Sequence, residues 1–134
     1  MTDRLKSMKR ILKVQDGIKR MADWRLAEAE RERAEAAEAG REIAAFIDRE
    51  MLTGPLAIAA VAQSGRLGER VAAAVLRAEA EAEALRDATA RQKLAGRAVA
   101  DLDRAERQRD ERKDLERLVE AFAARAPAGG SRKD

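Results

Sequence analysis

The chain contains no cysteine, no histidine and no tyrosine, and its 134 residues include only two prolines, one tryptophan and two phenylalanines. Without cysteine or histidine it has no thiol nucleophile, disulfide or imidazole base, and almost no means of binding zinc. Aromatic residues make up 2% and charged residues 40%, which excludes a compact core of large side chains. This composition is typical of long helices with thin apolar seams.

Patterns for catalysis and for membrane insertion are also missing. No glycine-rich phosphate-binding motif occurs, the serines have no histidine partner, and the carboxylates fall on predicted exposed helix faces rather than in a pocket. We therefore expect a non-enzyme with no catalytic, cofactor-binding or metal-binding residues. No run approaches the ~18 apolar residues of a membrane span, and no apolar signal segment follows the basic start. We expect a soluble, cytoplasmic protein.

The first long segment runs from about residue 3 to 52, with Thr2 or Asp3 able to cap its start. Its apolar residues repeat with a period of 3.5, which predicts a narrow, alanine-rich coiled-coil seam. The seam positions are Leu5, Met8, Leu12, Gln15, Lys19, Ala22, Leu26, Ala29, Arg33, Ala36, Gly40, Ile43, Ile47 and Glu50.

A break is predicted over residues 53–68, because TGPLAIAAVAQSGRLG carries a single charge and several glycines. Within it we expect a short helix from Pro55, with Leu56, Ile58 and Val61 covering the end of the rod. A second long helix is predicted from about residue 67 to 125. Its seam fades after Leu102, and residues 126–134 are predicted to be a disordered tail. The apolar face returns at Leu115, Leu118, Val119 and Phe122.

Two long helices joined by a short break predict an all-α antiparallel coiled-coil hairpin. Its register depends on the turn. A turn centred near residue 55 places Leu5 opposite about residue 105, and a turn centred near residue 60 places Leu5 opposite Leu115. We favour the second register because it buries both apolar ends of the rod against each other.

Charge is unevenly distributed along the chain. Residues 1–27 hold eight basic and three acidic residues and residues 91–134 hold twelve and nine, so the predicted terminal end carries +8. This end could dock onto an acidic partner, or its charges could simply be solvated flanks of a coiled coil. Nucleic acid is disfavoured as a partner, because acids are interleaved and stacking aromatics are scarce. The candidate docking residues are Arg4, Lys6, Lys9, Arg10 and Lys13, with Arg112, Lys113 and Arg117 across the seam.

Two apolar features invite a structural and a functional interpretation. Trp24 either covers the groove beside the seam, which we favour, or is an exposed anchor for a partner. Ile43, Phe46 and Ile47 cover more of the helix surface than one seam needs, so either they pack locally or they bind a partner. Because Ile43 and Ile47 satisfy the heptad, we expect Phe46 to point away from the seam.

The chain resembles the flagellar export protein FliJ family and its counterparts in virulence type III secretion. The resemblance covers about residues 3–123 and rests on a small basic chain, two Ala/Glu/Arg-rich helices around a break, the start RLKSMKRILKVQDGIKRMA and the closing LERLVEAF. It implies a stalk that links the hexameric export ATPase to the cytoplasmic domain of the export gate protein. It also implies an association with export chaperones and a peripheral position at the membrane export apparatus.

The resemblance implies two contact regions. The end with both termini, including the basic residues named above, would enter the ATPase ring. Gate contact would fall on residues in the middle of the chain, namely Ala39, Ile43, Phe46, Glu50, Leu67, Val71, Ala74 and Ala78. The aromatic content typical of that face is reduced here to Phe46. The alternatives are a generic coiled-coil scaffold or oligomerisation protein and, less favoured, a basic nucleic-acid-binding hairpin.

Overall fold

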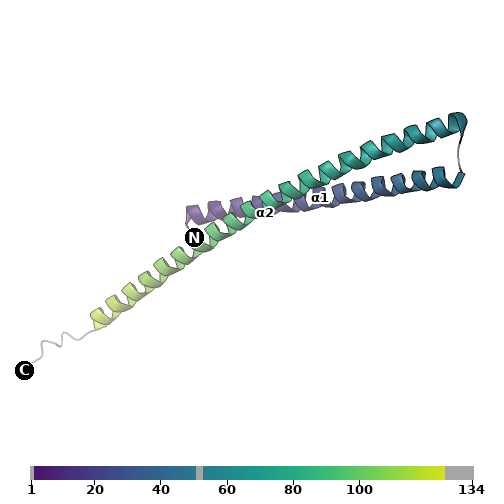
Figure 1. Cartoon of the computed structure of the whole chain (residues 1–134). Helices are drawn as coiled ribbons and strands as arrows, with labels where there is room; N and C mark the ends of the chain where they lie inside the picture. The colour runs from purple at the N-terminus through teal and green to yellow at the C-terminus, as the bar shows by residue number, and fades with distance from the viewer. Residues whose placement is uncertain (1, 51–52, 126–134) are drawn as a thin grey trace, which may run out of the picture. The chain divides into compact units, whose positions relative to one another are not determined.

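A computed structural model describes residues 2–50 and 53–125, and its only regular elements in these ranges are two helices, α1 (Asp3–Glu50) and α2 (Gly54–Arg125) (Figure 1). This confirms the predicted all-α hairpin of two long helices with a short break. The predicted tail at 126–134 lies outside the described residues. The chain divides into two compact units, of which unit 1 comprises residues 1–13 and 94–134, and unit 2 comprises Val14–Lys93.

Local chemistry explains where the helices begin. The hydroxyl of Thr2 accepts a hydrogen bond from the Leu5 amide at 3.2 Å, so Thr2 caps α1 as predicted. At the start of α2, Gly54 has a φ of 68°, a conformation that favours glycine. Pro55 follows in the first turn, where its fixed φ suits a helix and its missing N–H costs nothing.

The prediction that the second helix starts near residue 67 is wrong, because α2 is already helical from Gly54. The stretch that reads as a break is rich in alanine and leucine, which favour helix. Gly65 and Gly68 each cost only about 1 kcal/mol relative to alanine. Leu56, Ile58 and Val61 do not cover the end of the hairpin as expected, since they remain 59–73% exposed.

The core of unit 2 is an alanine seam. Ala29 and Ala36 of α1 are fully buried, and Ala74 and Ala78 of α2 expose 5% and 1%. Across both units, eight of the nine buried hydrophobic residues are alanines and the ninth is Leu5. Because alanine adds little volume between helices, the two backbones can approach closely. Of the predicted seam positions in α1, only Arg33 and Glu50 are exposed.

Polar contacts fix the register within each unit. In unit 2, Gln92 Nε2 donates to Asp16 Oδ1 at 2.7 Å, and Arg70 pairs with Glu32 across the seam at 3.2 Å. In unit 1, the Thr2 amide donates to Glu106 Oε2 at 3.1 Å. The turn is therefore centred near residue 55, and our preference for the register that places Leu5 opposite Leu115 is wrong. The register differs because α2 begins at Gly54 and not near residue 67, so the turn lies closer to the end of α1 than we expected.

A cross-linking experiment tests this register, since the chain has no native cysteine. We expect the double variant Thr2→Cys with Glu106→Cys to be joined efficiently within one molecule by a short bifunctional maleimide. The control pair Thr2→Cys with Leu118→Cys should not react, because twelve residues of helix move the second site by about 18 Å. Preferential cross-linking of the control pair would support the register that places Leu5 opposite Leu115.

Candidate functional site

The first candidate surface is a basic face at the start of α1, in unit 1. Arg4, Lys6, Lys9, Arg10 and Lys13 are all exposed, whereas Leu5 between them is buried at 1%. None of the five cations forms an ion pair with a carboxylate of the described residues. The predicted cluster therefore places five cations within ten residues of the start of α1, with Lys6, Lys9, Arg10 and Lys13 on one side of the helix and Arg4 on the other. We call this surface the basic face.

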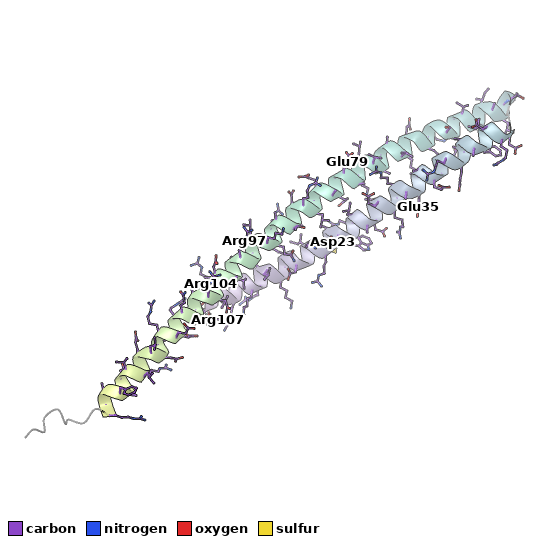
Figure 2. The ribbon with its side chains drawn as sticks, turned by 60° about the horizontal axis from the view of Figure 1, so that its bottom comes forward. Asp23, Glu35, Glu79, Arg97, Arg104 and Arg107 are labelled. Atoms are coloured by element: carbon purple, nitrogen blue, oxygen red, sulfur yellow. The ribbon has the colours of Figure 1, made fainter. Side chains whose placement is uncertain are left out.

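Local ion pairs are frequent elsewhere. In unit 2, Arg41 pairs with Glu38 at 2.7 Å, Arg86 pairs with Glu83, and Arg31 pairs with Glu28, all at i,i+3 spacing. Figure 2 shows the charged side chains that project along both helices, including Glu35 and Glu79 of unit 2. The interpretation of solvated flanks with local ion pairs thus describes much of unit 2, where Arg25, Arg77 and Arg91 are exposed cations without an ion pair among the described residues. The basic face differs in that it gathers five such cations within ten residues.

The basic face also opposes the dipole of its own helix. The N-terminus of an α-helix carries a partial positive charge, so cations in the first turn are unfavourable by about 0.3–1 kcal/mol each. Arg4 and Lys6 lie in or next to that turn, and Asp3 is its one acidic residue. A local preference that is broken in this way points to a role for the charges other than helix stability.

The second candidate surface is the end of α2, residues 107–125, where every residue is exposed. Since Thr2 lies opposite Glu106, this part of α2 continues past the start of α1 (Figure 1). The prediction that Arg112, Lys113 and Arg117 face the basic cluster across the seam is therefore wrong. They lie on the single-helix part of α2, which we call the α2 extension.

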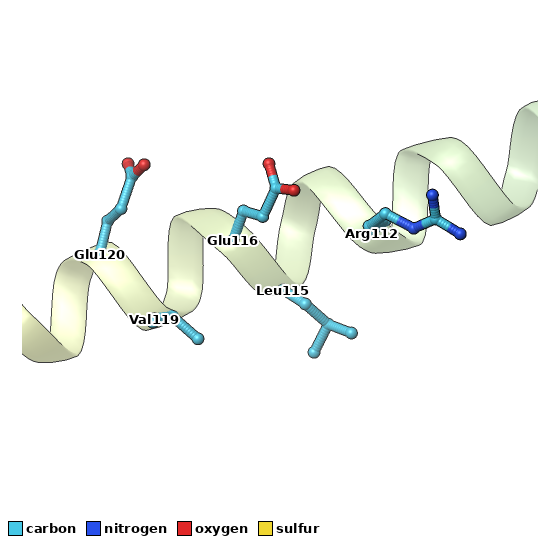
Figure 3. A pocket seen from close by; sticks show the side chains of 5 residues that line it. All are labelled: Arg112, Leu115, Glu116, Val119 and Glu120. Atoms are coloured by element: carbon cyan, nitrogen blue, oxygen red, sulfur yellow. The ribbon is translucent and has the colours of Figure 1, made fainter.

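The α2 extension carries an apolar stripe. Leu115, Leu118, Val119 and Phe122 are 56–70% exposed and follow the i, i+3, i+4, i+7 spacing of one helix face. Shallow grooves flank this stripe, and their borders are mainly acidic. One groove is lined by Glu111 and Asp114, and the other by Arg112, Glu116 and Glu120 (Figure 3). Figure 3 shows Glu116 and Glu120 projecting away from Leu115 and Val119.

The third candidate surface lies near the hairpin turn in unit 2. Phe46 is 36% exposed beside the half-buried Ile43 and Ile47, and the Arg49 guanidinium lies 6.0 Å from the centre of its ring. This agrees with the expectation that Phe46 points away from the seam. Of the other predicted gate residues, Glu50 is exposed, Ala39, Leu67 and Val71 are half-buried, and Ala74 and Ala78 are buried in the seam. The last two are not available to a partner while the hairpin is closed.

Sequence reasoning missed part of this third surface. Leu56, Ile58 and Val61 are exposed on the first turns of α2, which adds apolar area on the same unit as Phe46. The spacing of these three residues could have predicted their exposure. Positions 56 and 58 lie on opposite sides of a helix, so one packing partner cannot cover all three.

Trp24 is 62% exposed in unit 2, which favours an accessible ring over our preferred interpretation of a ring that covers the groove. Val14, Ile18 and Met21 precede it on α1 and are 42–59% exposed. Their spacing of three and four residues forms a further apolar stripe beside the seam.

Within residues 2–50 and 53–125, no helix is long and apolar enough to cross a membrane. The same residues hold no cluster of acidic side chains suited to binding a metal ion. Comparisons with protein-family models, with curated proteins and with solved structures found no match. Inference about function therefore depends on the three surfaces themselves.

Proposed function

We propose that this protein is a stalk component of a flagellar-type protein export apparatus and links the export ATPase ring to the cytoplasmic domain of the export gate. The observation that carries the proposal is the basic face, whose cations have no carboxylate partner in the described part of the chain and which lies in the same compact unit as the apolar-striped α2 extension. A generic coiled-coil scaffold would need neither feature, because its charges can be balanced within the helices, as they are around Glu38 and Glu83.

The ring contact is assigned to unit 1. A lone helix with an apolar stripe can enter a central opening, where its side chains are covered from all directions. The basic face can then guide the approach, since complementary charge accelerates association of proteins. The predicted residues Arg112, Lys113 and Arg117 contribute to this contact from the α2 extension, while Arg4, Lys6, Lys9, Arg10 and Lys13 contribute from α1.

The gate contact is assigned to unit 2, at the surface around Phe46. Phe46 is the one aromatic side chain there, and exposed aromatics are frequent anchors of protein interfaces. Leu56, Ile58 and Val61 provide further exposed apolar surface on this unit. In this proposal the protein works in the cytoplasm, at the membrane-bound export apparatus, and has no catalytic role.

Co-purification tests the proposal. The full chain is co-expressed with the hexameric export ATPase and, separately, with the cytoplasmic domain of the export gate protein. We expect it to elute with the ATPase hexamer at low salt, to dissociate as salt rises, and to bind the gate domain independently. Failure to bind either partner, with the chain folded as judged by circular dichroism, would overturn the proposal.

A Phe46→Ala variant separates stability from gate binding. Because Phe46 is partly exposed, we expect its loss to cost about 1 kcal/mol of unfolding free energy, well below the 3–5 kcal/mol of a buried phenylalanine. Gate binding should weaken, whereas ATPase binding should not. Phe122→Ala is the matched control, since it removes an exposed ring from unit 1 and should leave gate binding unchanged. A large drop in melting temperature with intact gate binding would make Phe46 a core residue.

A further inference from the structure

The α2 extension leaves an apolar helix face without a partner among the described residues. Leu115, Leu118, Val119 and Phe122 are each more than half exposed, although the remainder of α2 up to Glu106 keeps its seam positions covered. Isolated exposed side chains are ordinary on a protein surface, but four at helical spacing form a docking face. The occupant of this face is identified by the charges around it.

The border of the stripe is acidic, and the basic face of α1 is its complement. Glu111, Asp114, Glu116 and Glu120 line the two grooves beside the stripe, against one cation, Arg112. The five cations of the basic face have no carboxylate partner among the described residues. The aliphatic stems of these long side chains offer the apolar surface of the basic face, because Ile11, 46% exposed, lies beside Arg4 and on the side of the helix away from Lys9 and Lys13. The border of the stripe and the basic face therefore have opposite charge, although one border acid, Asp114, also pairs with Arg117 at 3.9 Å.

The basic face is long enough for the stripe. Arg4 to Lys13 extends over about 14 Å of helix and Leu115 to Phe122 over about 10 Å. One stripe offers on the order of a few hundred Å², which is short of the ~800 Å² per partner of a stable interface. A contact made twice, once in each direction, doubles the area and closes on itself as a two-fold dimer.

We infer that the acid-bordered stripe of the α2 extension packs on the basic face of a second copy of the chain, and that two copies do this reciprocally. The dimer requires no other component, so it does not depend on the proposed export function. It covers the surfaces assigned above to the ATPase ring. The dimer is therefore a form of the protein that cannot bind the ring.

Sedimentation velocity of the purified full chain tests the inference. At concentrations on the order of micromolar and at low salt we expect a monomer–dimer equilibrium that shifts toward monomer as salt increases. The double variant Leu118→Ser with Phe122→Ser should weaken dimerisation about a hundredfold. Leu76→Ser is the control, because Leu76 is a similarly exposed leucine of α2, 67% accessible, in unit 2. A strictly monomeric chain at all concentrations, or a dimer unaffected by the stripe variant, would overturn the inference.

A charge exchange identifies the occupant. Lys6→Glu with Lys9→Glu, and separately Glu116→Lys with Glu120→Lys, should each weaken dimerisation about tenfold or more. An equimolar mixture of the two variants should dimerise again, because both contacts in the mixed dimer then join opposite charges. A dimer that tolerates the Lys6/Lys9 variant would show that stripe packs on stripe, and would refute the assignment of the basic face.

Discussion

Replacing Ala29 and Ala36 together by leucine is expected to destabilise the hairpin by about 2–6 kcal/mol, since each overpacked core site costs about 1–3 kcal/mol. Both side chains are fully buried, and the α2 part of the same unit presents the buried Ala74 and Ala78. Leucine at these sites must force the helices apart, which removes the contacts of neighbouring alanines. Urea denaturation followed by circular dichroism measures the loss as a lower midpoint.

The matched control is the double variant Ala27→Leu with Ala34→Leu. These alanines have the same seven-residue spacing on α1 but are exposed, and leucine is nearly as good a helix former as alanine. The control should therefore unfold within about 0.5 kcal/mol of the wild type. A stabilising effect of leucine at positions 29 and 36 would show that the seam is wide, and would contradict the close approach of the helices.

The helices and their seam could be predicted because they depend on local periodicity. The heptad series in α1 places Ala22, Ala29 and Ala36 in the core, where the structure has them. The register could not be predicted in this way, because an alanine seam offers many similar alignments and few large side chains to choose among them. Polar contacts such as Gln92 with Asp16 indicate the alignment, and they follow no periodic rule.

Some features of the candidate surfaces could likewise be predicted from local sequence, whereas others depend on the register. The cluster from Arg4 to Lys13 is local in sequence, so its exposure and charge could be predicted. The position of Arg112, Lys113 and Arg117 depends on the register, and an error of several residues moved them from the α2 extension to a site facing α1. Burial of Ala74 and Ala78 likewise depends on which seam position of α2 faces α1, because small side chains occupy both faces of this segment.

Reversing the charge of Lys6, Lys9, Arg10 and Lys13 to glutamate is expected to slow association with the export ATPase hexamer about 10- to 100-fold, because the basic face is proposed to guide docking through complementary charge. The net charge of the chain falls from +3 to −5, since each of the four replacements removes two units. Helicity should be retained or rise slightly, because acidic residues near the start of α1 favour its dipole. Stopped-flow kinetics at protein concentrations below the dimerisation range give the association rate.

A second variant with the same net charge isolates the effect of location. Arg41, Arg66, Arg77 and Arg86 are exposed and lie in unit 2, so their replacement by glutamate changes the total charge equally but leaves the basic face intact. We expect this variant to associate within a few-fold of the wild type, with a similar salt dependence. Equal slowing by both variants would assign the effect to net charge alone. An unchanged rate for the first variant would show that the basic face does not guide docking to the ring.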